Sequence, residues 1–290
     1  MTTLNIIGCG KLGQSLGRLW SDSKEFRIGS ILNTSLDSAN QAVSHIGSGS
    51  ACEEMDQMKA ADVWLIASND ASIATISSKL SKFKHLRAQD IVFHCSGSLS
   101  SSALITCKEK GVDIASIHPV MSFTGTTLSA EDFINVHCSC EGDTAALHLL
   151  TQKFSAIGGK CFQISSESKN IYHTATVMCC NYLTALTEAS IQLYQQAGIE
   201  RDQSLALMHP IMTATLANIF QHGTTKALTG PIARGDTETV QNHLNALTDD
   251  KLQSIYRSLG EVALTLSEQQ GQANQRQLAE MSKLLSNSTN

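Results

Sequence analysis

A glycine-rich segment near the start of the chain, Gly8-Cys9-Gly10-Lys11-Leu12-Gly13, has the spacing G-x-G-x-x-G. Apolar residues precede it and leucines at helical spacing follow it, which places the glycines at a strand-to-helix turn. In such a turn the first glycine permits the sharp bend, the second lets the backbone approach a pyrophosphate, and the third lets the helix pack on the strand. The amides and the positive dipole end of the helix then face the phosphates. We expect Gly8, Gly10, Lys11, Leu12 and Gly13 to bind a dinucleotide; an unliganded glycine turn is the alternative.

The residues after the second expected strand bear on which dinucleotide is bound. An acidic side chain about 20 positions past the glycine motif would bind the ribose hydroxyls of NAD, but this place holds Asn33-Thr34-Ser35. The nearest acid, Asp37, stands where an early helical or capping residue would stand. Hydroxyls and an amide at a helix start, with Lys11 nearby, suit the 2′-phosphate of NADP, although no arginine occupies the usual position. We predict NADP(H) as the cofactor, contacted by Asn33, Thr34 and Ser35.

Polar side chains follow two further expected strands, and ligands of parallel sheets bind at such strand ends. Ser68 and Asn69 come after the apolar run 61–67 and should lie along the cofactor. Asp70 fits a helix cap equally well. Ser96 follows the run 90–94 and could hydrogen-bond the substrate or orient a histidine, although Ser-Gly-Ser is also an ordinary loop sequence.

His118 ends another expected strand, and Pro119 after it stops the ladder. A histidine near the nicotinamide is suited to general acid–base catalysis, because its pKa lies near neutrality and hydride transfer to a carbonyl needs a proton partner. We predict this role for His118, with a polar loop histidine as the alternative. For His94 the loop role is favoured.

A long helix is expected from residue 166 to residue 197, with no strong breaker before Gly198. One of its faces carries reactive types at helical spacing, namely Lys169, His173, Thr176, Cys180 and Thr184. The opposite face carries an apolar stripe. We take Lys169 and His173 as candidates lining a catalytic cleft; a solvated helix face is the alternative. Arg234, in a Gly-Pro turn, could clamp a carboxylate or phosphate, or could be a surface arginine.

Strands and helices alternate up to about residue 165, and only helices are expected beyond it. This pattern predicts an α/β fold, a doubly wound and mostly parallel sheet of the Rossmann type, followed by an all-helical domain. The domains expected are 1–165, which binds the dinucleotide, and 166–290, which completes the substrate site and forms a dimer. The expected strands are 4–7, 26–32, 61–67, 90–94, 112–117, 133–140 and 160–164. The helices expected after the long one are 202–220, interrupted at Pro210, then 236–247, 249–266 and a last one that reaches residue 285.

Composition excludes several classes of protein. The 290 residues carry a net charge of -5, so no basic field favours nucleic acid. We expect no signal peptide and no membrane span. The nine cysteines have no framework spacing, which indicates a reducing, cytoplasmic compartment. His137, Cys138 and Cys140 could bind a metal, but the run fits a buried strand better, and no metal site is predicted.

Several motifs together resemble the Rossmann-like oxidoreductases that carry a C-terminal helical domain of unknown function. These motifs are the glycine loop, His94-Cys95-Ser96-Gly97, His118-Pro119-Val120-Met121-Ser122-Phe123, Tyr172-His173 with Asn181-Tyr182, and Gly230-Pro231-Ile232-Ala233-Arg234-Gly235-Asp236. The group is similar to β-hydroxyacid dehydrogenases, ketopantoate reductase and prephenate dehydrogenase. Pyrroline-carboxylate reductase shares the architecture, without its helical-domain signature being visible here. The resemblance implies an NADP-dependent oxidoreductase that is often dimeric through the helical domain.

The resemblance also implies roles for single residues. Prephenate dehydrogenases have a catalytic histidine in a His-Pro segment, which corresponds to His118, and a serine that corresponds to Ser96. The β-hydroxyacid dehydrogenases have a catalytic lysine followed four positions later by asparagine. Here Lys169 is followed by His173, so a lysine mechanism is in doubt.

These expectations combine into one functional hypothesis. The protein would be an NADP(H)-dependent oxidoreductase that transfers hydride to or from a small polar, anionic carbonyl or hydroxy compound. His118 would handle the proton, assisted by Ser96. The alternative is a non-catalytic NADP(H)-binding sensor that keeps the glycine loop without the chemistry.

Overall fold

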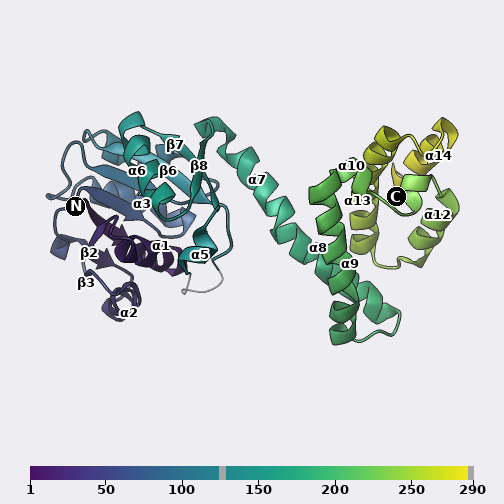
Figure 1. Cartoon of the computed structure of the whole chain (residues 1–290), viewed down its shortest axis with the longest axis horizontal. Helices are drawn as coiled ribbons and strands as arrows, with labels where there is room; N and C mark the ends of the chain where they lie inside the picture. The colour runs from purple at the N-terminus through teal and green to yellow at the C-terminus, as the bar shows by residue number, and fades with distance from the viewer. Residues whose placement is uncertain (124–128, 287–290) are drawn as a thin grey trace. The chain divides into compact units, whose positions relative to one another are not determined.

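The computed structural model describes residues 1–123 and 129–286 and divides the chain into two compact units, unit 1 (Met1–Asn181) and unit 2 (Tyr182–Asn290) (Figure 1). The division lies later than the boundary expected after residue 165. Residues 166–181 belong to unit 1, because the helix that begins at Lys169 buries this side chain against the strand-end loops of the sheet. His173 therefore also lies in unit 1.

The described residues of unit 1 form one eight-stranded sheet in the order β3-β2-β1-β4-β5-β6-β7-β8. The strands are β1 Thr3–Ile7, β2 Arg27–Leu32, β3 Ser50–Cys52, β4 Val63–Ile66, β5 Ile91–His94, β6 Asp113–Pro119, β7 His137–Gly142 and β8 Lys160–Gln163. Every neighbouring pair is parallel except β6 and β7. The prediction of a mostly parallel, doubly wound sheet is confirmed. The sequence analysis did not locate β3, because three residues are too few to show a period.

Helices cover both faces of this sheet. The helices of unit 1 are α1 Lys11–Asp22, α2 Leu36–Ile46, α3 Asp70–Leu80, α4 Ile105–Lys108, α5 Ala130–Phe133, α6 Thr144–Ala156 and α7 Lys169–Cys179, with 3₁₀ turns at Met55–Gln57, Ser101–Leu104 and Ser166–Ser168. Of these, α7 does not cover the sheet, since only Lys169 at its start is buried. Alternate strand residues face opposite sides, so Leu65 packs in one core and Trp64 in the other. Cys138 and Cys140 are buried in β7, as the strand interpretation predicts.

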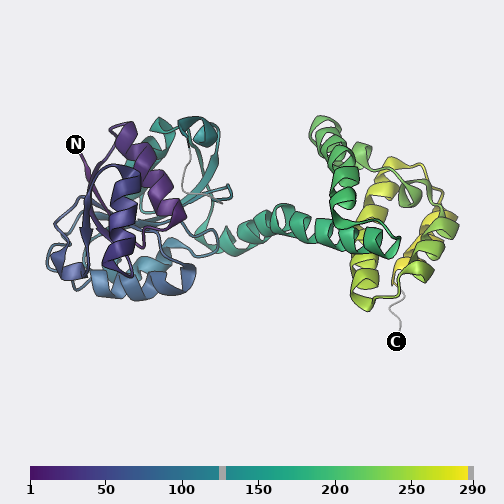
Figure 2. The same cartoon turned by 90° about the horizontal axis from the view of Figure 1, so that it is seen from below.

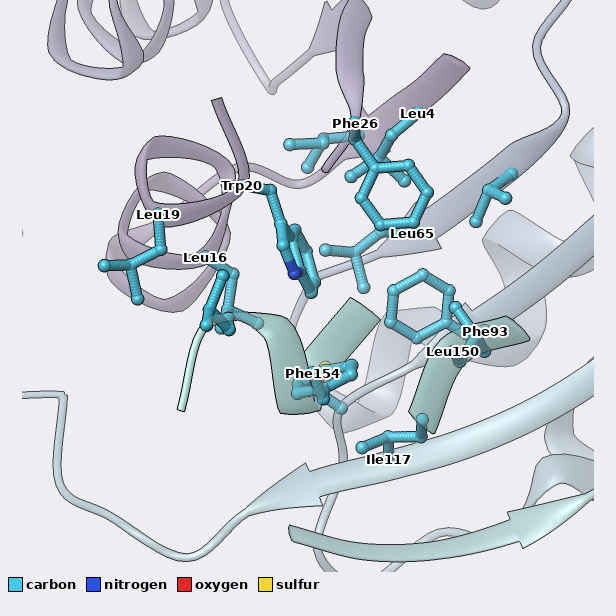
Figure 3. Packing of buried hydrophobic residues seen from close by; sticks show 14 of the residues in the cluster. Leu4, Leu16, Leu19, Trp20, Phe26, Leu65, Phe93, Ile117, Leu150 and Phe154 are labelled. Atoms are coloured by element: carbon cyan, nitrogen blue, oxygen red, sulfur yellow. The ribbon is translucent and has the colours of Figure 1, made fainter. Parts of the chain in front are cut away.

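Trp20 at the centre of one core joins α1 to α6 (Figure 3). Its ring lies edge-on to Phe26 and Phe154, with centroids 5.3 and 5.1 Å away. Its indole N–H donates to the carbonyl of Lys153 at 3.0 Å. Full burial of such a ring contributes roughly 1.5–3 kcal/mol or more. This packing holds α1, and with it the glycine turn, against the sheet.

The expected single helix over residues 166–197 is wrong. A 3₁₀ turn precedes α7, and the chain breaks at Cys180 (φ −111°, ψ −65°) before α8, Asn181–Gln196. No glycine or proline marks this break. It falls at the end of unit 1, where Lys169 anchors α7 in one unit and Ile191 of α8 is buried in the other.

The described residues of unit 2 contain helices and no strand (Figure 2). After α8 come α9 Arg201–His222, α10 Thr224–Ala227, α11 Pro231–Arg234, α12 Thr237–Ala246, α13 Asp250–Gln270 and α14 Gln275–Ser286. The predicted interruption at Pro210 is wrong, since α9 passes through it, and the exposed proline removes only one backbone donor. No helix in the described part of the chain is long and apolar enough to cross a membrane.

Candidate active site

The three glycines of the turn between β1 and α1 each occupy a position that fits a distinct role. Gly8 has φ +77°, and a Cβ there would lie 2.8 Å from the Cβ of Ser68. A Cβ on Gly13 would lie 3.1 Å from Ala67, so this glycine allows close packing of the helix on the sheet. Gly10 has no atom within 4 Å of the corresponding position. Its open side can receive the backbone of a bound dinucleotide.

The first turn of α1 is suited to an anion. Gly10 caps the helix without a side-chain hydrogen bond, and the first turn, which begins at Lys11, has no acidic residue. The helix N-terminus thus presents backbone amides and a positive dipole end that no carboxylate neutralises. Its chemistry fits the pyrophosphate of a dinucleotide.

Asn33 ties the glycine turn to the end of β2. The Cys9 amide donates to Asn33 Oδ1 at 2.5 Å, and Asn33 Nδ2 donates to the Ser38 carbonyl and hydroxyl at 3.0 and 2.8 Å. The amide expected at the 2′-phosphate is therefore engaged within the protein. Ser35 caps α2 and accepts from the Ser38 amide at 3.2 Å, whereas Thr34 faces the adjoining groove.

This groove has a volume of about 600 Å³ and runs past the glycine turn. Of the predicted cofactor residues, Gly8, Gly10, Asn33, Thr34, Ser68 and Asn69 line it, whereas Lys11, Leu12, Gly13 and Ser35 are not among its lining residues. Asn69 also caps α3, because its Oδ1 accepts from the Ser72 amide at 3.1 Å. Sequence reasoning missed three charged residues of the groove, Glu53, Glu54 and Lys79.

A second hollow, a cleft of about 260 Å³, adjoins the groove at Ser68, which lines both. The structure brings Ser96, His118 and His173 together in this cleft. The wall also includes Leu12, Ile66, Ala67, Asp70, Cys95, Gly97, Pro119, Met121 and Phe123. Three of the four predicted catalytic residues thus share one site, and Lys169 is not among its lining residues.

His118 is the best-placed proton-handling group of the cleft. Its Nδ1 lies 3.1 Å from the Tyr172 hydroxyl, and its ring meets that of His173 edge-on at 5.9 Å. A Cβ on Gly97 would lie 3.0 Å from His118 Nε2, so only glycine lets the loop approach so closely. Burial, followed by the charges of Lys169 and His173, lowers the pKa of His118 to about 4. The imidazole is therefore neutral at physiological pH.

Ser96 lies in a loop that two hydrogen bonds of His94 support. Its hydroxyl accepts from the Ser98 and Leu99 amides at 3.2 and 3.0 Å, and its own hydrogen can go to the Ser98 hydroxyl at 3.5 Å or to a bound substrate. The Ser96 amide donates to His94 Nδ1 at 3.1 Å, and His94 Nε2 bonds the Ser100 carbonyl at 3.1 Å. Burial lowers the pKa of His94 to about 4. His94 is a neutral structural residue beneath the loop.

Lys169 is buried behind the cleft, with 1% of its surface exposed. Its Nζ donates to the Ser96 carbonyl at 2.8 Å and to the Ser116 hydroxyl at 2.9 Å. Burial lowers its pKa, and the charge of Glu141 opposes that shift. The expectation of a cleft-lining lysine is therefore wrong; Lys169 holds the loop that carries Ser96.

Two residues of this region escaped sequence reasoning. Glu141 is buried and accepts from the Ser101 amide and hydroxyl at 2.7 and 2.8 Å and from the Ser166 hydroxyl at 2.6 Å. Tyr172, the partner of His118, entered only as part of a motif. Its place beside His173 on one helix was the available signal. Arg234 is exposed on α11 of unit 2.

Comparisons with known proteins agree with this fold. A family model for a Rossmann-like domain matches residues 2–119, and one for a domain of unknown function (DUF2520) matches residues 136–263. Among curated proteins, no sequence matches the chain.

Several solved structures share the whole architecture. A Thermotoga maritima protein is 28% identical, with a TM-score of 0.71, over 92% of this chain and 98% of that one. A proposed NADP oxidoreductase from Bacteroides fragilis is 20% identical, with a TM-score of 0.70, over 93% and 97%. A Plasmodium falciparum pyrroline carboxylate reductase with NADP bound is 11% identical, with a TM-score of 0.58, over 98% of both chains. The chain thus carries a region that matches a Rossmann-like domain, followed by one that matches a domain of unknown function (DUF2520).

Proposed function

We propose that this protein is an NADP(H)-dependent oxidoreductase that transfers hydride to or from a small polar carbonyl or hydroxy compound. The observation that carries the proposal is the junction of the dinucleotide groove and the His118 cleft at Ser68. A nicotinamide dinucleotide held in the groove would supply or accept the hydride. His118 would bind the reacting oxygen and handle its proton, and the Ser96 hydroxyl would orient the substrate.

The chain's own residues explain how the substrate would be held. Met121, Phe123 and Leu12 line the cleft and would pack against the apolar part of a bound substrate. The anionic substrate expected from the sequence would need a cationic side chain, and the described residues of this cleft include no lysine or arginine. The proposal is therefore confined to a polar carbonyl or hydroxy group.

The test of catalysis is His118→Ala in an assay that follows NADPH oxidation over a panel of carbonyl compounds. Loss of an acid–base group lowers the rate by about 10²–10⁴-fold. His209→Ala, which removes an exposed histidine of unit 2, is the control and should retain full activity. His118→Ala activity within a factor of about three of wild type would reject the role. Tight NADPH binding with no turnover of any compound would instead support a sensor.

We propose NADP(H) rather than NAD(H) because the end of β2 carries Thr34 and no acidic residue. Glu53 and Glu54 line the same groove and would disfavour a 2′-phosphate if they approached it. Dissociation constants for NADPH and NADH decide the matter. We expect NADPH to bind at least about tenfold more tightly, and Thr34→Glu to reverse the preference by charge repulsion. Equal affinity, or a preference for NADH, would reject this choice.

We further propose that the protein is a homodimer through unit 2. Helix α9 has 22 residues, of which only Ser204 and Met208 are buried. Its exposed apolar side chains include Leu205, Leu207, Ile211, Leu216 and Phe220. A helix with so little packing of its own needs a partner surface.

Light scattering after size exclusion should give twice the chain mass. Phe220→Glu together with Ile211→Glu should give a monomer, whereas Leu36→Glu, at an exposed leucine of unit 1, should leave the dimer intact. A monomeric wild-type protein would contradict the proposal.

A further inference from the structure

The contact between His118 and Tyr172 joins the end of strand β6 to the first turn of helix α7. The Tyr172 hydroxyl lies 3.1 Å from His118 Nδ1, and the two rings meet edge-on at 5.9 Å. Phe162 packs on the tyrosine ring from β8 at 6.2 Å. Because the phenol ring is held by neighbours, its hydroxyl has a fixed direction toward the histidine.

Ser139 is a buried residue that can donate a hydrogen bond to the Tyr172 hydroxyl. It lies opposite His118 in the register of β6 and β7 and is fully buried. The Ser139 hydroxyl has no hydrogen-bond partner among the described residues, and burial raises the pKa of the Tyr172 phenol, which the neighbouring Ser139 and Thr176 hydroxyls lower. A serine hydroxyl that donates to the phenol oxygen leaves the phenol hydrogen for His118 Nδ1.

Because His118 is neutral, the direction of its hydrogen bond with Tyr172 determines which ring nitrogen carries the hydrogen. The groups that face the ring are Lys169, His173, Asp70 and Tyr172, and the first two, together with burial, favour the neutral imidazole. A neutral imidazole has one donor nitrogen and one acceptor nitrogen. When Nδ1 accepts from Tyr172, the hydrogen resides on Nε2.

Nε2 is the nitrogen on the cleft side of the ring. A Cβ on Gly97 would lie 3.0 Å from it, and both Gly97 and His118 line the cleft. A hydrogen on Nε2 therefore lies on the side of the ring where a substrate oxygen would bind. Such a neutral donor stabilises charge that develops on the oxygen without reorganisation, and when its proton passes to the oxygen, Nδ1 takes the hydrogen of the Tyr172 hydroxyl, so that the imidazole stays neutral and the phenol regains a proton from solvent.

We propose that Tyr172 is a positioning residue that fixes His118 as the Nε2–H tautomer and directs this hydrogen into the cleft toward the oxygen of a carbonyl substrate. The proposal rests on the proposed function for the substrate group, but its geometry needs neither substrate nor cofactor. Tyr172 acts through His118 and does not itself touch the reacting atoms.

The test is nitrogen NMR of the full-length protein labelled with ¹⁵N-histidine at neutral pH. The chain has 10 histidines, so the His118 signals are assigned by their loss in His118→Asn. In the wild type we expect an acceptor-type signal from Nδ1 and a protonated-type signal from Nε2. Tyr172→Phe keeps the ring packing and removes only the hydroxyl, and it should convert these signals into those of a mixed tautomer population. Tyr182→Phe removes an exposed hydroxyl of unit 2 and should leave them unchanged.

Two results would overturn the inference. One is a hydrogen on Nδ1 in the wild type; the other is an unchanged His118 spectrum in Tyr172→Phe. Failure here is separate from failure of the proposed function, because loss of NADPH turnover in His118→Ala can coexist with either result.

Discussion

The dinucleotide groove and the His118 cleft adjoin at Ser68, yet backbone conformation shapes the first and buried side chains determine the properties of the second. The groove owes its form to backbone, since Gly8 bends the chain at φ +77° and Gly10 leaves one side open. The cleft owes its properties to buried side chains, since Lys169 sits behind it and its charge acts on His118. We infer that substitutions in the groove act mainly through shape, and those in the cleft mainly through electrostatics.

The largest expected effect is the dependence of stability on pH, which arises beneath the cleft. The pKa of His94 is about 4 in the folded chain, against about 6.5 when unfolded. The unfolded state therefore binds a proton first, so this stabilisation is complete above pH ~6.5 and is lost as pH falls toward ~4. A shift of this size corresponds to about 3 kcal/mol.

Urea unfolding at a series of pH values measures this dependence. His118 has a pKa of about 4 as well and contributes over the same range, so His94→Gln should reduce the slope between about pH 6.5 and 4 by roughly half, even if it lowers stability at every pH. The exposed His209 provides the control, since His209→Gln should keep the wild-type slope. A wild-type slope in His94→Gln would mean that His94 is not a buried neutral group.

The next prediction compares the stability of alanine variants at two glycines of the groove, Gly8 and Gly10. Gly8→Ala places a Cβ against the backbone of Ser68 at a positive φ, so we expect a loss of roughly 1–3 kcal/mol in unfolding free energy. Gly10→Ala meets no atom within 4 Å and should leave stability within about 0.5 kcal/mol of wild type.

NADPH binding should nevertheless weaken at least about tenfold in Gly10→Ala, because the new methyl group occupies the open side of the turn. Thermal unfolding and a fluorescence titration with NADPH check the pair. The view that this groove acts through shape would fail if Gly10→Ala bound NADPH as tightly as the wild type does.

These two regions also differed in how far the sequence could predict them. The glycine turn is contiguous, so its strand, bend and helix could be predicted from the single stretch 4–20. Asn33 was placed in the right loop, but its hydrogen bonds to Cys9 and Ser38 depend on how β2 and α2 meet the turn. Those partners are not visible from spacing alone.

The cleft could be predicted only in part, because helical periodicity shows which residues share a face and not which way the face turns. On α7 the apolar side chains of Ile171 and Met178 are exposed, while Lys169 on the polar face is buried. Lys169 was assigned to a cleft wall from the residue types on its face, and those types do not show that its ammonium group is buried. His118 and Ser96 were found because strand ends converge in any parallel sheet.

The smallest expected effect is a shift in the pKa of His118 when the buried charge is removed. Lys169→Met keeps the length of the side chain and deletes the ammonium group that lowers this pKa. The pKa should rise, and because burial is the larger cause, it should stay below the ordinary value of about 6.5. NMR titration of His118 measures the shift, and Lys160→Met, at an exposed lysine of β8, should leave it unchanged. Lys169→Met also leaves the Ser96 carbonyl and the Ser116 hydroxyl without their donor. A loss of stability alone, with the pKa of His118 unchanged, would mean that Lys169 supports the cleft only through its hydrogen bonds. The contrast between a groove shaped by backbone and a cleft tuned by buried charge would then disappear.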